Sequence, residues 1–177
     1  LRPLYLILTA TAGMGMVPLV WSRLDEDKKA RFVSLILIDE YLHSIGWQQY
    51  WGLVAIGSGK LWGMGYLQGG HHNLFARNND FIFTVAAEEF GFVGGMLLMA
   101  ILMFIVLALL RDMFYSRDLL GMYLCGGLMS LIGFQSIINL GMNLRVVPVI
   151  GITLPFFSRG GSSALAIFLG VGVALSV

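Results

Sequence analysis

The sequence contains few charged residues, which occupy only 12% of its 177 positions. Soluble domains carry about 25% charged residues, so this composition excludes an ordinary soluble domain. Hydrophobic residues make up 58% of the chain, and the mean hydropathy is +0.82. The chain is therefore expected to be a membrane protein, and its net charge of +1 gives no indication of nucleic-acid binding.

Cysteine is nearly absent as well. The single Cys125 lies in an apolar stretch, which excludes a disulfide framework and a zinc site made of four cysteines. His71 and His72 are adjacent and do not share one helical face, so no metal ligands are predicted. A secretory signal pattern is also missing, because a span-length apolar stretch without a clear cleavage site follows Arg2 directly. The abrupt, apolar ends of the sequence suggest a fragment of a larger polytopic protein.

Four apolar stretches are long enough to cross a bilayer, which takes about 20 residues. They cover residues 3–22, 81–110, 119–144 and 160–177. We therefore predict an all-α polytopic membrane protein in which residues 1–177 form a single membrane domain.

Two loops lie between these stretches on one side of the membrane. Residues 23–80 are too many for a simple connector, which suggests a functional loop, and residues 145–160 form a second loop. Aromatic residues, polar residues and glycines are mixed over 41–67, which favours helices lying at the membrane interface. The excess of Lys and Arg in the longer loop, taken alone, favours a cytoplasmic position.

Asp80 is the first candidate for chemistry, because a carboxylate at the mouth of a membrane helix is costly unless it is capped, paired or used. One interpretation is an N-cap that accepts a backbone N–H of the first turn. Thr84 and Glu88 follow at i+4 and i+8, on the same helical face, and predict a polar cleft. Gly91 and Gly95 form a small-residue pair that predicts close helix packing.

Amide side chains recur in the third stretch. Gln135, Asn139 and Asn143 stand at i, i+4 and i+8, so they form one polar stripe along a membrane helix. Hydrogen bonds between helices are one interpretation of this stripe, and the wall of a polar cleft is the other.

A glycine- and serine-rich segment precedes the last stretch. Its backbone N–H groups at a helix start can bind an anion, and Arg159 adds a full positive charge. Arg145, at the other end of the same loop, adds a second charge in this interpretation, whereas a plain cap and turn explains the segment equally well. The candidate binding residues here are Ser158, Arg159, Gly160, Gly161, Ser162 and Ser163.

An acid and an anion-binding loop on one membrane face are typical of enzymes that transfer a group from a lipid-linked phosphate. A cation-coupled transporter explains the same residues almost as well.

Four blocks of sequence resemble the RodA/FtsW/SpoVE family, also called SEDS, whose members are bacterial peptidoglycan glycosyltransferases. The blocks follow one another in the order found in the family. They are residues 46–49 with 55–59, 80–83 with 87–92, 139–142, and 154–156 with 158 and 160–163.

The resemblance implies about four transmembrane helices from the C-terminal half of a ten-helix bundle in the bacterial plasma membrane. It places the loops 23–80 and 145–160 outside the cytoplasm, against the charge count. It implies that Asp80 is the general base in the polymerisation of lipid II, and that Gln49 and Asn139 belong to the substrate site. A class B penicillin-binding protein is the implied partner, and a divalent cation, Mg or Mn, the possible cofactor.

The chain departs from the family pattern at Arg159, where an aromatic residue is usual, at Lys60, where glycine is usual, and over 76–79. A lipid II flippase and a non-catalytic scaffold of the synthase complex remain alternatives to the glycosyltransferase. The fragment alone is expected to be inactive.

Overall fold

The computed structural model describes residues 3–37, 46–70 and 79–175, and in these ranges it contains helices and loops but no strand. The all-α prediction is therefore confirmed for this part of the chain. His71 and His72, and parts of the loop 23–80, lie outside it. The helices are α1 Pro3–Arg23, α2 Glu26–Val33, α4 Trp47–Ser58, α5 Ile82–Tyr115, α6 Leu119–Asn143 and α7 Gly161–Ala174.

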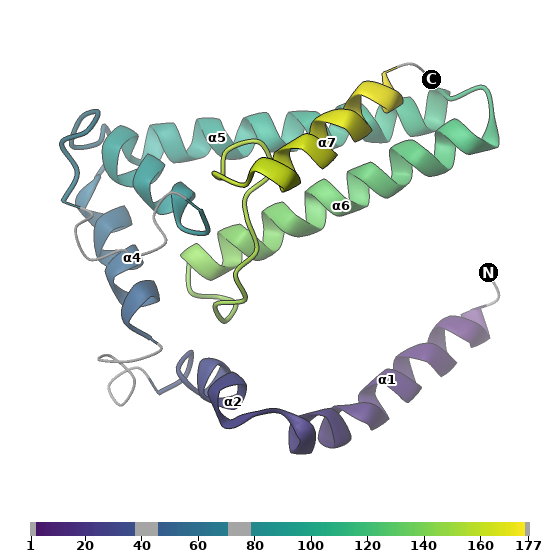
Figure 1. The fold of residues 1–177 in the computed structure, drawn as a ribbon, viewed down its shortest axis with the longest axis horizontal. Coiled ribbons are helices and arrows are strands. Elements are labelled where there is room, and N and C mark those ends of the chain that lie inside the picture. The colour runs from purple at the N-terminus through teal and green to yellow at the C-terminus, as the bar shows by residue number, and fades with distance from the viewer. Residues whose placement is uncertain (1–2, 38–45, 71–78, 176–177) are drawn as a thin grey trace.

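The centre of the fold is the antiparallel pair α5 and α6, with α7 packed beside them (Figure 1). One apolar cluster joins the three helices through Leu109, Ile132 and Ile167. A second cluster, around Phe83, Leu98, Leu102 and Leu154, lies nearer the start of α5. By length and composition, α5 and α6 are the two helices in the described residues that are able to cross a membrane. The apolar α7 is shorter, with 14 residues.

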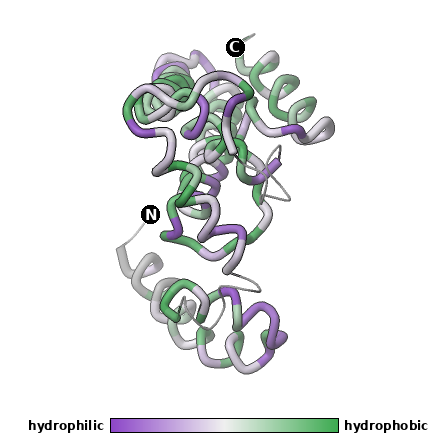
Figure 2. Tube along the Cα trace, turned by 90° about the vertical axis from the view of Figure 1, so that its left-hand side faces the viewer, coloured by the Kyte–Doolittle hydropathy of each residue, from purple (hydrophilic) through white to green (hydrophobic). Residues whose placement is uncertain are grey.

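The helices α1 and α2 extend away from this bundle (Figure 1). Figure 2 shows hydrophilic residues gathered in the part formed by α2. Two arginines connect α2 to the loop after α6. The guanidinium of Arg31 donates to the carbonyl of Val149 (2.9 Å), and that of Arg145 donates to the carbonyls of Ser34 (3.0 Å) and Leu35 (3.1 Å). The two loops therefore meet at one end of the bundle.

The long helix α5 is broken at Gly91, whose φ of 70° and ψ of −166° are not helical. Its 34 residues would extend about 51 Å as a straight helix, against a hydrocarbon core of about 30 Å. The break divides α5 into two unequal parts, which we call the first half, residues 82–90, and the second half, residues 92–115. The sequence predicted no interruption here.

The break frees backbone groups on both sides of Gly91, and the turn after α4 supplies partners for them. This pairing requires glycine, because a Cβ on Gly91 would overlap the backbone of Gly63 and Leu61. The predicted helix–helix contact at Gly91 is therefore wrong, since Gly91 lies against the turn. Four backbone hydrogen bonds make up this pairing. The N–H groups of Met64 and Gly65 donate to the carbonyls of Glu88 (3.0 Å) and Glu89 (3.0 Å), and those of Phe92 and Val93 donate to the carbonyls of Lys60 (2.8 Å) and Leu61 (3.2 Å).

Candidate active site

Asp80 lies two residues before the start of α5, and its backbone is held there by amide side chains of α6. Its backbone carbonyl accepts hydrogen bonds from Nδ2 of Asn139 (2.9 Å) and Nδ2 of Asn143 (3.0 Å). The N-cap residue of α5 is Phe81, which makes no side-chain capping hydrogen bond. The interpretation of Asp80 as an N-cap is therefore wrong, and its carboxylate is not used to satisfy the backbone of α5.

The Asp80 carboxylate faces the second loop at Gly151. A Cβ built on Gly151 would lie 3.6 Å from Oδ2 of Asp80, and Gly151 has a positive φ of 79°. Asp80 is half-buried, and this burial raises the pKa of its carboxyl above the ordinary value of 3.8. A raised pKa makes the carboxylate a stronger proton acceptor than a solvated aspartate.

Asn139 and Asn143 are both fully buried and connect three segments of the chain. Oδ1 of Asn143 accepts from the Thr84 hydroxyl (2.6 Å) and from the Thr84 N–H (3.3 Å). Nδ2 of Asn139 also donates to the carbonyl of Ile152 (2.7 Å), in the second loop. The interpretation of these amides as hydrogen bonds between helices is confirmed for Asn143, which binds Thr84 on α5, whereas Asn139 binds the carbonyls of two loop residues. Oε1 of Gln135 is buried without a hydrogen-bond partner among the described residues.

The predicted polar face of Asp80, Thr84 and Glu88 is divided between two neighbours. The Thr84 hydroxyl is bound to Asn143 on α6. Glu88 is 2% exposed, and its carboxylate accepts the N–H of Gly70 (2.6 Å), beyond the turn that follows α4. The structure therefore brings Thr84 close to Asp80 and directs Glu88 toward the longer loop.

The glycine- and serine-rich segment packs directly against the residue before Asp80. The Ser158 hydroxyl donates to the carbonyl of Asn79 (2.6 Å) and accepts the N–H of Leu154 (2.7 Å). The helix α7 begins at Gly161, with Gly160 as its N-cap residue. This arrangement places the N-terminus of α7 on the same side of the bundle as Asp80.

A family model described as "Cell cycle protein" (FtsW, RodA, SpoVE) matches residues 2–177, which is nearly the whole chain. The chain belongs to the FtsW/RodA/SpoVE family. The resemblance carried by the four sequence blocks is thereby confirmed.

Curated relatives in this family are similar over part of their length. The peptidoglycan glycosyltransferase RodA of Treponema pallidum (strain Nichols) is 35% identical over 135 residues, covering 75% of this chain and 31% of the relative. The stage V sporulation protein E of Bacillus subtilis (strain 168) is 38% identical over 134 residues, covering 75% and 37%. The peptidoglycan glycosyltransferase MrdB of Escherichia coli (strain K12) is 33% identical over 167 residues, covering 92% and 45%.

A solved structure supports the same family. Its title is "Structural coordination of polymerization and crosslinking by a peptidoglycan synthase complex", and one of its chains matches with a TM-score of 0.75 and 31% identity. The match covers 97% of this chain and 47% of that chain. The chain thus spans less than half the length of these relatives.

Within the FtsW/RodA/SpoVE fold, Arg145 and Gln49 have partners other than the serine- and glycine-rich segment. Arg145 binds the two carbonyls at the end of α2, as described above. Gln49 is 1% exposed, and its Nε2 donates to the carbonyls of Met142 (3.1 Å) and Val147 (2.8 Å). Both side chains position the loops around Asp80, whereas Arg159, Gly161 and Ser162 are exposed at the start of α7.

Gly151 and Asn143 are the two residues of this site that sequence reasoning did not place there. Asn143 was recognised as part of the amide stripe, and its spacing from Asn139 was the available signal. Gly151 gave no signal of its own, because its importance comes from a loop that returns to Asp80 through tertiary contacts.

Among the described residues, no three His, Cys, Asp or Glu side chains gather closely enough to hold a metal ion. The divalent cation that the family resemblance implied stays a prediction, and we derive no step through such an ion.

Proposed function

We propose that this chain forms part of a peptidoglycan glycosyltransferase that polymerises lipid II into glycan strands, with Asp80 as the general base. The observation that carries the proposal is the placement of Asp80. Its backbone is fixed by two buried asparagines. Its carboxyl does not cap α5, and burial raises the pKa of this carboxyl. The names of the relatives RodA and MrdB support the reaction class.

In the proposed reaction, Asp80 accepts the proton of the acceptor sugar's 4-hydroxyl group. The oxygen attacks the anomeric carbon of the growing strand, and the bond to undecaprenyl diphosphate breaks. The start of α7 carries exposed N–H groups and Arg159, which suit the leaving diphosphate. Two hydrogen bonds keep Asp80 in place for the acceptor sugar. Asn139 donates to the Asp80 carbonyl, and Thr84 donates to Asn143.

The proposed setting is a ten-helix bundle that crosses the bacterial plasma membrane several times. The loops 23–80 and 145–160 lie outside the cytoplasm in this proposal, and α4 lies at the membrane interface. The proposed partner is a class B penicillin-binding protein. The neighbour titled as a peptidoglycan synthase complex supports this assembly.

The test is the polymerisation of labelled lipid II by the full-length protein and its Asp80→Asn variant. This substitution keeps the size and hydrogen-bonding capacity of the side chain but removes the base. Loss of a general base is expected to lower the rate by about 10²–10⁴-fold. The matched control is Asp27→Asn, an exposed carboxyl in α2, which is expected to retain the wild-type rate.

Unchanged polymer yield in Asp80→Asn would overturn the catalytic role of Asp80. If neither protein polymerises lipid II but both move it across vesicle membranes, the protein is a flippase. If neither activity is found and the partner's activity depends on the protein, it is a scaffold.

A further inference from the structure

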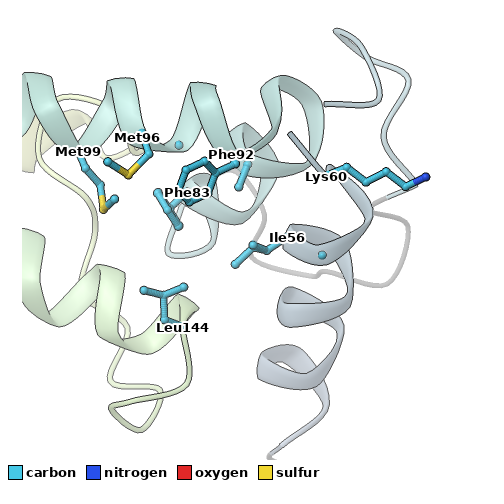
Figure 3. Close-up of a pocket in the computed structure, with 10 residues that line it drawn as sticks. Ile56, Lys60, Phe83, Phe92, Met96, Met99 and Leu144 are labelled. Carbon is cyan, nitrogen blue, oxygen red and sulfur yellow. The ribbon is translucent and has the colours of Figure 1, made fainter. Parts of the chain in front are cut away.

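A cavity of about 310 Å³ lies between α4, α5 and the end of α6. Figure 3 shows how apolar side chains from the three helices surround it. Lys60 is the charged residue of the lining, and no acid contributes to it among the described residues. The largest apolar contributors are Ile56, Phe83, Phe92, Met96, Met99 and Leu144.

This cavity adjoins the candidate active site. Phe83 belongs to the first turn of α5, three residues after Asp80. Leu144 directly follows Asn143, whose amide holds the Asp80 carbonyl at 3.0 Å. The cavity and the Asp80 site therefore share the start of α5 and the end of α6 as walls.

Lys60 stands at the rim of the cavity in a backbone conformation that favours glycine, with a φ of 49°. Figure 3 shows its side chain extending away from the apolar interior, so that the ammonium group lies at the exposed edge. The salt bridges in the described residues join Lys28 to Asp25 and Lys29 to Glu26, which leaves the Lys60 ammonium unpaired with any carboxylate there. A cation beside an apolar cavity matches a ligand with a hydrocarbon chain and an anionic head.

We infer that this cavity holds part of the polyprenyl chain of the acceptor lipid II, with the Lys60 ammonium paired to the diphosphate of that lipid, whereas the leaving diphosphate of the growing strand lies at the start of α7. The inference rests on the proposed function, because it names where that substrate's chain binds. Ligand cavities range from about 300 to 1,000 Å³. The observed volume is at the lower end, so the cavity takes one segment of the chain and the remainder lies in the bilayer.

Gly57 allows the cavity to be filled without disturbing the backbone. It lines the cavity within α4, and a Cβ built on it meets nothing within 4 Å. Gly57→Leu therefore occupies the space with a side chain. Gly127→Leu is the matched control, because Gly127 lies in α6, away from the cavity, and its Cβ also meets nothing within 4 Å.

The experiment measures equilibrium binding of labelled undecaprenyl diphosphate to the full-length protein in phosphatidylcholine nanodiscs. Gly57→Leu is expected to weaken binding about tenfold, since it removes the space for the chain. Gly127→Leu is expected to bind as the wild type does. Lys60→Gln is expected to weaken binding about two- to fivefold, and Lys60→Arg to restore it.

Equal binding by Gly57→Leu and the wild type would overturn the inference. Displacement of the label by an equal amount of phosphatidylglycerol would also overturn it, because the cavity would then be a site for bulk lipid. If Gly57→Leu does not fold, a photoreactive residue at Met96, in the cavity, is compared with one at Phe104, exposed on the same helix. Equal crosslinking of the label at both positions would contradict the inference.

This readout is independent of polymerisation. Binding through the cavity by a protein that does not polymerise lipid II would refute the proposed function alone. Polymerisation by Gly57→Leu with an unchanged half-saturating concentration of lipid II would refute the cavity assignment alone.

Discussion

The two halves of α5 bury different kinds of residues, although they form one continuous stretch of chain. The first half, 82–90, buries Thr84, Glu88 and Glu89 together with apolar side chains. The second half, 92–115, buries only apolar residues and glycine, and it exposes large apolar side chains such as Phe104, which is 71% exposed.

The difference separates residues held by directional hydrogen bonds from residues held by apolar packing. Buried polar groups are costly unless they are paired, and pairing fixes their geometry. Thr84 and Glu88 therefore have partners far away in sequence, Asn143 and Gly70. The second half is held by packing, which is less directional and tolerates exchange of one apolar residue for another. Substitutions in the two halves are consequently expected to have different effects.

Replacing Gly91, the residue between the two halves of α5, is expected to have the largest effect on stability. Gly91→Ala introduces a Cβ at a φ of 70°, where it would overlap the backbone of the turn at Leu61 and Gly63. Strain and overlap together are expected to cost about 3 kcal/mol or more, with loss of folded protein. Thermal unfolding of the purified full-length protein in detergent measures this loss.

Gly127→Ala is the control for this prediction, because a Cβ at Gly127 meets nothing within 4 Å. In a helix interior, alanine is more favourable than glycine by about 1 kcal/mol. The control should therefore unfold at the same temperature as the wild type or slightly above it. A Gly91→Ala protein as stable as this control would show that the break at Gly91 is not required.

Removing the amide that supports the first half should reduce activity per folded molecule. Asn143→Ala leaves the Thr84 hydroxyl without its acceptor and removes one of the two donors to the Asp80 carbonyl. An unsatisfied buried group costs about 1–3 kcal/mol, and misplacement of Asp80 should lower the rate of lipid II polymerisation. Unfolding temperature and polymerisation rate are measured on the same preparation.

Leu109→Ala in the second half sharpens the comparison. Leu109 is 5% exposed in the apolar cluster shared with α6 and α7, so its truncation is expected to cost about 2–5 kcal/mol of stability. The rate per folded molecule should stay near that of the wild type, since the cluster of Leu109 is separate from the one around Phe83 at the start of α5. An equal loss of rate in both variants would mean that the two halves are not functionally distinct.

The smallest expected effect is the dependence on pH. Burial raises the pKa of Asp80 in the folded protein above 3.8, so ionisation costs the folded state more than the unfolded state. The contribution of Asp80 to stability is fully present below 3.8 and is lost as the pH rises to the raised folded value. Asp80→Asn does not ionise, so its stability relative to the wild type should increase through this window.

The rate of polymerisation should change with pH in the opposite direction to stability, because only the ionised carboxylate accepts a proton. The rate of polymerisation is expected to fall toward acid with a midpoint above 3.8. A midpoint at or below 3.8 would show that the carboxyl is not desolvated in the working enzyme.

Much of the helical architecture could be predicted from the sequence. The stretches 81–110 and 119–144 correspond closely to α5 and α6, because long apolar runs without charge are the strongest local signal of a membrane helix. The break at Gly91 could not be predicted, because it depends on pairing with a turn more than twenty residues earlier in the chain. A glycine within an apolar run is equally compatible with close helix packing.

The sequence was enough to single out Asp80 as a candidate, but not to predict the residues that hold it. Asp80 stood out because a carboxylate beside an apolar run needs a reason. The positions of Arg145 and Gln49 depend on loops folding back onto α2 and α6, which no local pattern encodes. Local patterns therefore indicated a candidate residue but not the tertiary contacts around it.

The pairing of the turn with the broken helix also has a consequence for biogenesis. The turn at residues 60–65 is synthesised before α5, but its partners in the hydrogen-bonded pairing do not exist until α5 has been made. A nascent α5 entering the bilayer must therefore be either a longer straight helix or a shorter one that begins after Gly91. Its final form arises only when the turn docks, so this end of the fold is completed after α5 has been synthesised.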